Sequence, residues 1–151
     1  MELIIVAAII SSLAVLGTMN LVGSQRQSGM DAAVVQVVSD LREQRIRAMT
    51  GDTEGTGTIS SYGIYFGTDA YTLFRGNSYA AGDAANFVVN LDSTISFANV
   101  NFPGGVVVFS DGSGEVAGWS SATDSFALTD PDNGTTKTIT INQYGVPVAI
   151  N

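Results

Sequence analysis

The sequence predicts an α+β fold in which a long N-terminal α-helix is followed by an antiparallel all-β globular head. Three observations support this fold class. Residues Leu3–Val22 are predominantly apolar on every side of a helix. From Ser28 to Met49, apolar residues recur at helical spacing. After Gly55 the apolar period changes to two and turn residues arrive roughly every 8–12 residues, as in antiparallel strands. The predicted parts are therefore residues 1–27, 28–50 and 51–151.

Residues 1–27 are predicted to form an apolar helix that crosses a membrane. At 1.5 Å per residue, Leu3–Val22 spans roughly 30 Å, the thickness of a bilayer core. The first basic residue is Arg26, so the run lacks the basic start of a secretory signal peptide. Glu2 stands at the beginning of the run, and a carboxylate in a membrane is costly unless it is neutralised or paired. We therefore expect Glu2 to meet a cationic partner.

The segment from Gly17 to Gly23 has a low helix propensity, because it contains both glycines together with Thr18 and Asn20. Two interpretations stay open here. The helix unwinds locally at Gly17 and Gly23, or it continues unbroken.

Residues 28–50 are predicted to form an amphipathic helix that packs on the head. Its apolar stripe consists of Val34, Val37, Val38, Leu41 and Ala48. Arginines gather in the last turns, where the helix dipole favours cations, and Gly51 follows as a stop signal.

Residues 51–151 are predicted to form short antiparallel strands joined by turns. Tyr62–Phe66 and Tyr71–Arg75 are expected to pair as one hairpin, and Ser125–Leu128 and Thr136–Ile141 as another. The remaining expected strands are Phe87–Leu91, Thr94–Phe97, Val106–Phe109, Glu115–Trp119 and Val146–Ile150. Val106–Phe109 is continuously apolar, which predicts that it is the most buried strand.

The composition and motifs give little sign of a catalytic or metal site. The chain contains no cysteine and no histidine, so it has neither a thiolate nor an imidazole for catalysis or metal binding. Asp130, Asp132 and Asn133 form a weak calcium candidate, as do Asp111 and Glu115, but Asp-Gly and Asn-Gly are also common turn dipeptides. Asn133-Gly134-Thr135 matches the glycosylation acceptor pattern. No enzymatic activity and no cofactor are expected.

Charge argues against a nucleic-acid partner for the head. Residues 51–151 contain ten of the 14 acidic residues but only two of the six basic ones, Arg75 and Lys137. Two cations cannot supply the several phosphate contacts that drive such binding.

The N-terminal run resembles the mature N-terminus of the type IV pilin and pseudopilin superfamily, which has the form F-T-L-x-E-L-x-x-V-x-A-I-I. Met1 to Ile10, MELIIVAAII, matches this form from its fourth position on. The family has its glutamate at the fifth mature residue, whereas Glu2 is the second residue here, and the usual helix proline is absent. The head looks like that of H-type pseudopilins and FimT-like minor pilins in the segments YGIYF, YTLFRG, VVVFSDGSG and TITINQYGVP.

This resemblance implies a pilin-like fold and a subunit of a helical, cell-surface filament whose core is the apolar helix. It implies an inner-membrane pool before assembly, processing by a prepilin peptidase, methylation, assembly machinery, and copies of the chain itself as partners. The implied assembly residues are Glu2, Leu3, Ile4, Ile5, Val6, Ile9, Ile10, Leu13 and Leu16.

Three functions remain open from the sequence. The favoured one is a filament-forming pilin, serving adhesion, motility, uptake or secretion. The second is a minor pseudopilin of a type II secretion or pilus-priming complex. The third is a membrane-tethered β-domain that binds a partner without polymerising, although a simple tether has no use for the carboxylate of Glu2.

Overall fold

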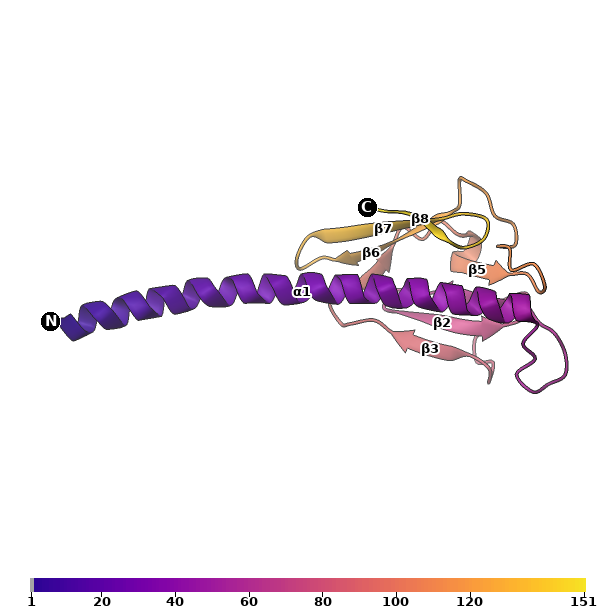
Figure 1. Cartoon of the computed structure of the whole chain (residues 1–151), viewed down its shortest axis with the longest axis horizontal. Helices are drawn as coiled ribbons and strands as arrows, with labels where there is room; N and C mark the ends of the chain where they lie inside the picture. Colours follow the sequence, from indigo (N-terminus) through magenta and orange to yellow (C-terminus); the bar gives the residue numbers. More distant parts are fainter. Residues whose placement is uncertain (1) are drawn as a thin grey trace.

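A computed structural model describes the backbone of residues 2–151 and the side chains of residues 5–7, 10–11 and 27–151. One helix, α1, extends over Glu2–Thr50. Figure 1 shows that its first half projects away from the strands, whereas its second half lies along them. We call residues 27–151 the head.

Within residues 51–151 the chain forms two antiparallel sheets of four strands each. The first sheet has the order β3-β2-β1-β5 and the second the order β4-β6-β7-β8. The strands of the first sheet are β1 (Tyr62–Phe66), β2 (Ala70–Arg75), β3 (Phe87–Asn90) and β5 (Val106–Phe109). Those of the second are β4 (Ser96–Ala98), β6 (Ser125–Asp130), β7 (Thr135–Ile141) and β8 (Pro147–Ile150), and a short 3-10 helix covers Pro103–Gly105.

Both predicted hairpins are confirmed. β1 pairs with β2 in a register that places Ile64 opposite Leu73. β6 pairs with β7 from Ser125 opposite Thr140 to Asp130 opposite Thr135. Each turn consists of residues that favour tight bends, so the strand order within each hairpin follows from local sequence.

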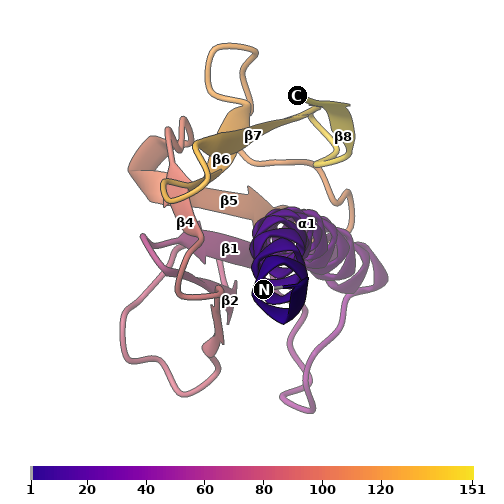
Figure 2. The ribbon, with the colours of Figure 1, turned by 90° about the vertical axis from the view of Figure 1, so that its left-hand side faces the viewer.

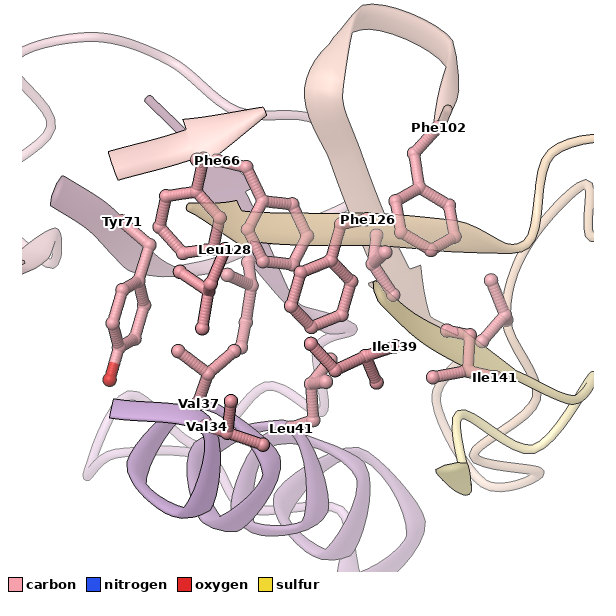
Figure 3. Packing of buried hydrophobic residues seen from close by; sticks show 14 of the residues in the cluster. Val34, Val37, Leu41, Phe66, Tyr71, Phe102, Phe126, Leu128, Ile139 and Ile141 are labelled. Carbon is pink, nitrogen blue, oxygen red and sulfur yellow. The ribbon is translucent and has the colours of Figure 1, made fainter. Parts of the chain in front are cut away.

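The helix and both sheets share one hydrophobic core. Viewed along α1 in Figure 2, the helix lies beside both sheets, and it contacts β1, β5 and β6. Figure 3 shows Val34, Val37 and Leu41 pointing from α1 towards side chains of the strands. The fully or almost fully buried apolar residues of α1 are Met30, Val34, Val37, Leu41 and Ala48. They meet an aromatic cluster formed by Phe66, Tyr71, Phe97, Phe102 and Phe126.

The predicted fold class, a long apolar N-terminal helix followed by an antiparallel all-β globular head, is wrong. The helical stretch whose side chains are described without a gap, residues 27–50, is neither N-terminal nor apolar. Among residues with described side chains, 31% lie in strands and 25% in helix. The physical reason lies in burial. Each sheet has one apolar face that needs a cover, and the stripe of α1 covers both, so this half of the helix belongs to the core of the head.

Two strand predictions are also wrong. Glu115–Trp119 does not form a strand, since only a single bridge joins Val116 to Phe109. Val106–Phe109 is not the most buried strand, because only Val107 and Phe109 are buried while Val106 and Val108 are half-buried. Burial alternates along β5, so Val106 and Val108 lie on the face of the sheet opposite that of Val107 and Phe109.

Candidate assembly surface

The projecting half of α1 carries the predicted assembly residues. Ile5, Val6 and Ile10 have exposed fractions of 61%, 53% and 62%. The side chains of Glu2, Leu3, Ile4, Ile9, Leu13 and Leu16 lie outside the described residues. The three described side chains are therefore aliphatic surface that the head does not cover.

The backbone of α1 is helical through Gly17 and Gly23 in the isolated chain. The side-chain surroundings of this stretch lie outside the described residues. Local unwinding at these glycines stays a prediction beside the alternative of an unbroken helix.

The outward side of α1 continues the apolar surface along the head. Val35, Ile46 and Met49 have exposed fractions of 67%, 58% and 45%. Their spacing of eleven and three residues places them on one side of the helix, opposite the stripe that faces the sheets. This side of the helix is available for contact with another chain.

A buried polar contact fixes α1 on β2. The carboxylate of Asp40 is only 7% exposed and accepts hydrogen bonds from the hydroxyl of Tyr71 and, at 3.2 Å, from the amide of Gln36. Burial and the neighbouring Asp40 carboxylate raise the pKa of Tyr71 well above its ordinary value, so the hydroxyl keeps its proton and donates. The sequence reasoning missed Asp40, although its position between Val37 and Leu41, beside the apolar stripe, was a usable signal.

The C-terminal end of α1 is closed by backbone and charge together. Asp52 N–H donates to Arg47 O at 3.0 Å and Gly51, at φ 65°, follows the last helical residue, as in a Schellman cap. The Arg47 guanidinium donates to Asp52 at 2.9 Å and to Glu54, and it lies 4.7 Å from the ring centre of Tyr62. The predicted stop at Gly51 is confirmed.

Charge sets the protonation of this cap. Partial burial opposes the charge of Arg47, but its hydrogen bond to Asp52 and the negative charge of Glu54 raise its pKa. The backbone N–H of Glu54 and the guanidinium of Arg47 lower the pKa of Asp52. Both groups are therefore charged at neutral pH, and they tie the loop after α1 to the helix.

A cleft of about 390 Å³ lies between α1 and the side of the sheet that ends in β3. Asp40, Glu43, Gln44 and Arg47 contribute to it from the helix, and Leu73, Phe87 and Val89 from the strands. Gln44 is 1% exposed, and neither polar atom of its amide has a hydrogen-bond partner among the described residues. The wall formed by the helix is thus polar and acidic, and the strand wall is apolar.

The weak calcium candidates serve as turn residues. Asp130 is buried, and its carboxylate accepts the backbone N–H groups of Asp132 at 3.1 Å and Asn133 at 3.3 Å, which closes the turn between β6 and β7. Asp111 interacts with Ser61 instead of Glu115. Within the described part of the chain, no three acidic, histidine or cysteine side chains gather as a metal site. The weak calcium candidates stay an untested prediction, and the contacts of Asp130 and Asp111 support the alternative that these are turn residues.

Both basic residues of 51–151 are already engaged. Lys137 forms an ion pair with Asp31 of α1. Arg75 donates to Thr53 O at 3.2 Å and to the hydroxyl of Thr56 at 3.1 Å, and lies 3.9 Å from Glu54. The absence of a nucleic-acid partner for residues 51–151 stays a prediction, now with these contacts as an added reason.

Among the residues described with their side chains, no helix is long and apolar enough to cross a membrane. Most of Leu3–Val22, on which the membrane prediction rests, lies outside those residues.

Comparison with known proteins identified no relative of the chain. No family model matches the chain, and no curated protein or solved structure matches it significantly.

Proposed function

We propose that the chain is a structural subunit of a type IV pilus-like extracellular filament, in which copies pack through the half of α1 that precedes the head. One observation carries this proposal. That half of α1 projects from the sheets, and its described side chains Ile5, Val6 and Ile10 are largely exposed. Exposed aliphatic side chains on a projecting helix are stable when other apolar surface covers them, and equivalent helices of neighbouring copies provide such cover.

Burial in a bundle of helices favours assembly strongly. Covering one Ile or Val side chain contributes about 1.5–3 kcal/mol relative to water. In this proposal the carboxylate of Glu2 pairs with an N-terminal amine of an adjacent copy, because the bundle leaves no water to solvate a lone charge.

The proposal includes a membrane pool before assembly, a prepilin peptidase, assembly machinery and a final location on the cell surface. The resemblance of residues 1–10 to the pilin N-terminus supports these partners. The protein has no enzymatic role in this proposal.

The experiment that tests the proposal co-expresses wild type and Glu2→Ala in one cell, with distinguishable tags. Glu2→Ala should fold and reach the membrane normally but enter sheared filaments at least tenfold less than wild type. Asp69→Ala, which removes an exposed carboxylate of the head, is the matched control and should enter normally. If Glu2→Ala and Asp69→Ala are incorporated into sheared filaments equally well, Glu2 is not an assembly residue.

A minor pseudopilin is the second candidate, because the head segments resemble H-type pseudopilins and FimT-like minor pilins. Mass spectrometry of the same sheared filaments separates the two. A major subunit dominates the preparation, whereas a minor one is a trace component. Absence of the chain from any filament would favour the membrane-tethered β-domain.

A further inference from the structure

Each sheet of the head has one outer strand whose edge is covered and one whose edge is open. The outer edge of β4 is covered because Phe97 N–H donates to Thr68 O at 2.8 Å. The outer edge of β5 is covered because Val108 O accepts Ala117 N–H at 2.8 Å. From residues 2–151 of the chain, no backbone hydrogen bond reaches the outer edge of β3 or of β8.

These two open edges also carry exposed apolar side chains. Phe87 and Val88 of β3 have exposed fractions of 65% and 55%, and Val148 and Ile150 of β8 have 62% and 49%. A short apolar edge with unpaired backbone groups is a template for pairing with another strand. Pro147 lacks an N–H, so pairing on β8 is confined to the three residues that follow it.

Both edges continue the apolar faces that α1 covers. Phe87 stands opposite Leu73 of β2, and Ile150 stands opposite Ile139 of β7. Directly opposite residues point to the same face of a sheet. Leu73 faces the cleft beside α1 and Ile139 lies in the core, so Phe87 and Ile150 lie on the helix-facing sides, beyond the reach of the helix.

The charges of α1 differ between these edges. Figure 1 shows β3 on one side of α1 and β8 on the other. On the β3 side the cleft is lined by Asp40, Glu43 and Arg47 of the helix and by Glu54, so its acidic groups outnumber its one basic group. On the other side Arg45 lies 5.6 Å from the ring centre of Tyr144, three residues before β8, and Arg42 precedes Arg45 by one helical turn. An acidic wall thus accompanies the β3 edge and a basic wall the β8 edge.

We propose that the β3 edge of one copy pairs with the β8 edge of the next copy, so that neighbouring heads in the filament share a continuous sheet. The inference rests on the proposed filament function and names a contact that holds the heads together. Pairing of unlike edges leaves a free β8 at one end and a free β3 at the other, and such a head-to-tail contact builds an open filament when its rotation does not close a ring. Pairing of two β3 edges would close a dimer and place the two acidic walls together.

In this contact the apolar side chains Phe87, Val148 and Ile150 come to lie on one face of the joined sheet. The acidic side of one α1 then faces the basic side of the next across them. Backbone pairing gives the contact its geometry, and the charges select β8 over a second β3 as the partner edge.

Disulfide trapping tests the contact, because the wild-type chain contains no cysteine. Full-length Phe87→Cys and Ile150→Cys subunits, each with its own tag, are co-expressed, and sheared filaments are oxidised. In the proposed register Phe87 of one copy stands directly opposite Ile150 of the next, which brings the two positions within the span of a disulfide. We expect disulfide-linked pairs that contain one subunit of each kind, at a yield at least tenfold above pairs of like subunits.

The matched control replaces Phe87→Cys by Val88→Cys, which carries its thiol on the other face of β3. It should give at least tenfold fewer mixed disulfides with Ile150→Cys. Filaments that form normally but show no mixed Phe87–Ile150 disulfide would overturn the edge pairing and leave the filament function standing. Absence of filaments from the wild type would overturn both.

A charge exchange gives a second, independent readout. Glu43→Arg alone and Arg42→Glu alone should each lower the mixed disulfide yield several-fold, since each places like charges across the contact. A subunit with both changes should recover most of the mixed disulfide yield. Its two sides of α1 have then exchanged their charges, so that opposite charges again face each other across the contact. Failure of the double variant to recover, with a normally folded head, would show that the two walls do not meet.

Discussion

At the scale of single residues, the contact between Asp40 and Tyr71 is the polar anchor of the head. The Asp40 carboxylate is buried under α1 and accepts the Tyr71 hydroxyl of β2 and the Gln36 amide. A buried carboxylate is tolerated only when hydrogen bonds replace its lost hydration. These contacts therefore fix the rotation of α1 about its axis, and with it the sides on which Glu43 and Arg42 stand.

Tyr71→Phe should lower the free energy of unfolding by about 1–3 kcal/mol, because it leaves the buried Asp40 carboxylate with the Gln36 amide as its remaining side-chain donor. Denaturant unfolding followed by Trp119 fluorescence measures the change. Tyr144→Phe removes a hydroxyl from a tyrosine that is 39% exposed and should have almost no effect. Equal stability of the two variants would show that the Asp40 contact is not an anchor.

At the scale of elements, two glycines have opposite roles. Gly29 lies within α1, and a Cβ added there meets nothing within 4 Å. Gly63 lies in β1, and a Cβ added there would be 2.5 Å from Val107 O and 2.6 Å from a ring carbon of Phe74. The ring of Phe74 occupies the space that a side chain would take, on the face of the sheet away from α1. The glycine in the helix is thus dispensable and the one in the strand is not.

Gly29→Ala should stabilise the protein by about 0.5–1 kcal/mol, because alanine is the better helix former. Gly63→Ala should destabilise it by about 1–3 kcal/mol, because Phe74 and the β5 backbone must move. Thermal unfolding of both variants beside wild type measures the two effects. A stabilising Gly63→Ala would mean that β1 and β5 are not packed as described.

At the scale of the whole molecule, the described core of the head is built from residues that follow the projecting half of α1. The described core begins at Met30 and includes residues from the helix and both sheets. The projecting half presents Ile5, Val6 and Ile10 outward. Folding of the head and assembly through the helix are therefore separable in this structure.

A chain lacking residues 1–26 should fold with mixed helix and strand signals in circular dichroism. It should not form filaments, because it lacks the side chains proposed to build the helix bundle. Sedimentation analysis and electron microscopy check the assembly state against the full chain. Loss of the folded spectrum would show that the first half of α1 is needed for the core.

The sequence alone determined those features that depend on neighbouring residues. The two hairpins follow from turn residues between apolar runs, and the end of α1 follows from Gly51 after a run of arginines. The stripe from Val34 to Ala48 follows from helical periodicity, and its members Val34, Val37, Leu41 and Ala48 are buried as predicted. Local pattern was sufficient here because each feature is stabilised within one or two turns of chain.

The tertiary structure decided the features that join distant segments. The continuous apolar run Val106–Phe109 could not reveal that β5 is an outer strand, because the position of a strand in its sheet depends on partners far away in sequence. The assignment of Asp130 to a turn depended on which backbone N–H groups reach its carboxylate. The predicted fold class, an apolar N-terminal helix followed by an all-β head, failed for the same reason. A stripe of apolar residues shows that a helix is covered, but only long-range packing shows that it covers two sheets at once and leaves β3 and β8 open.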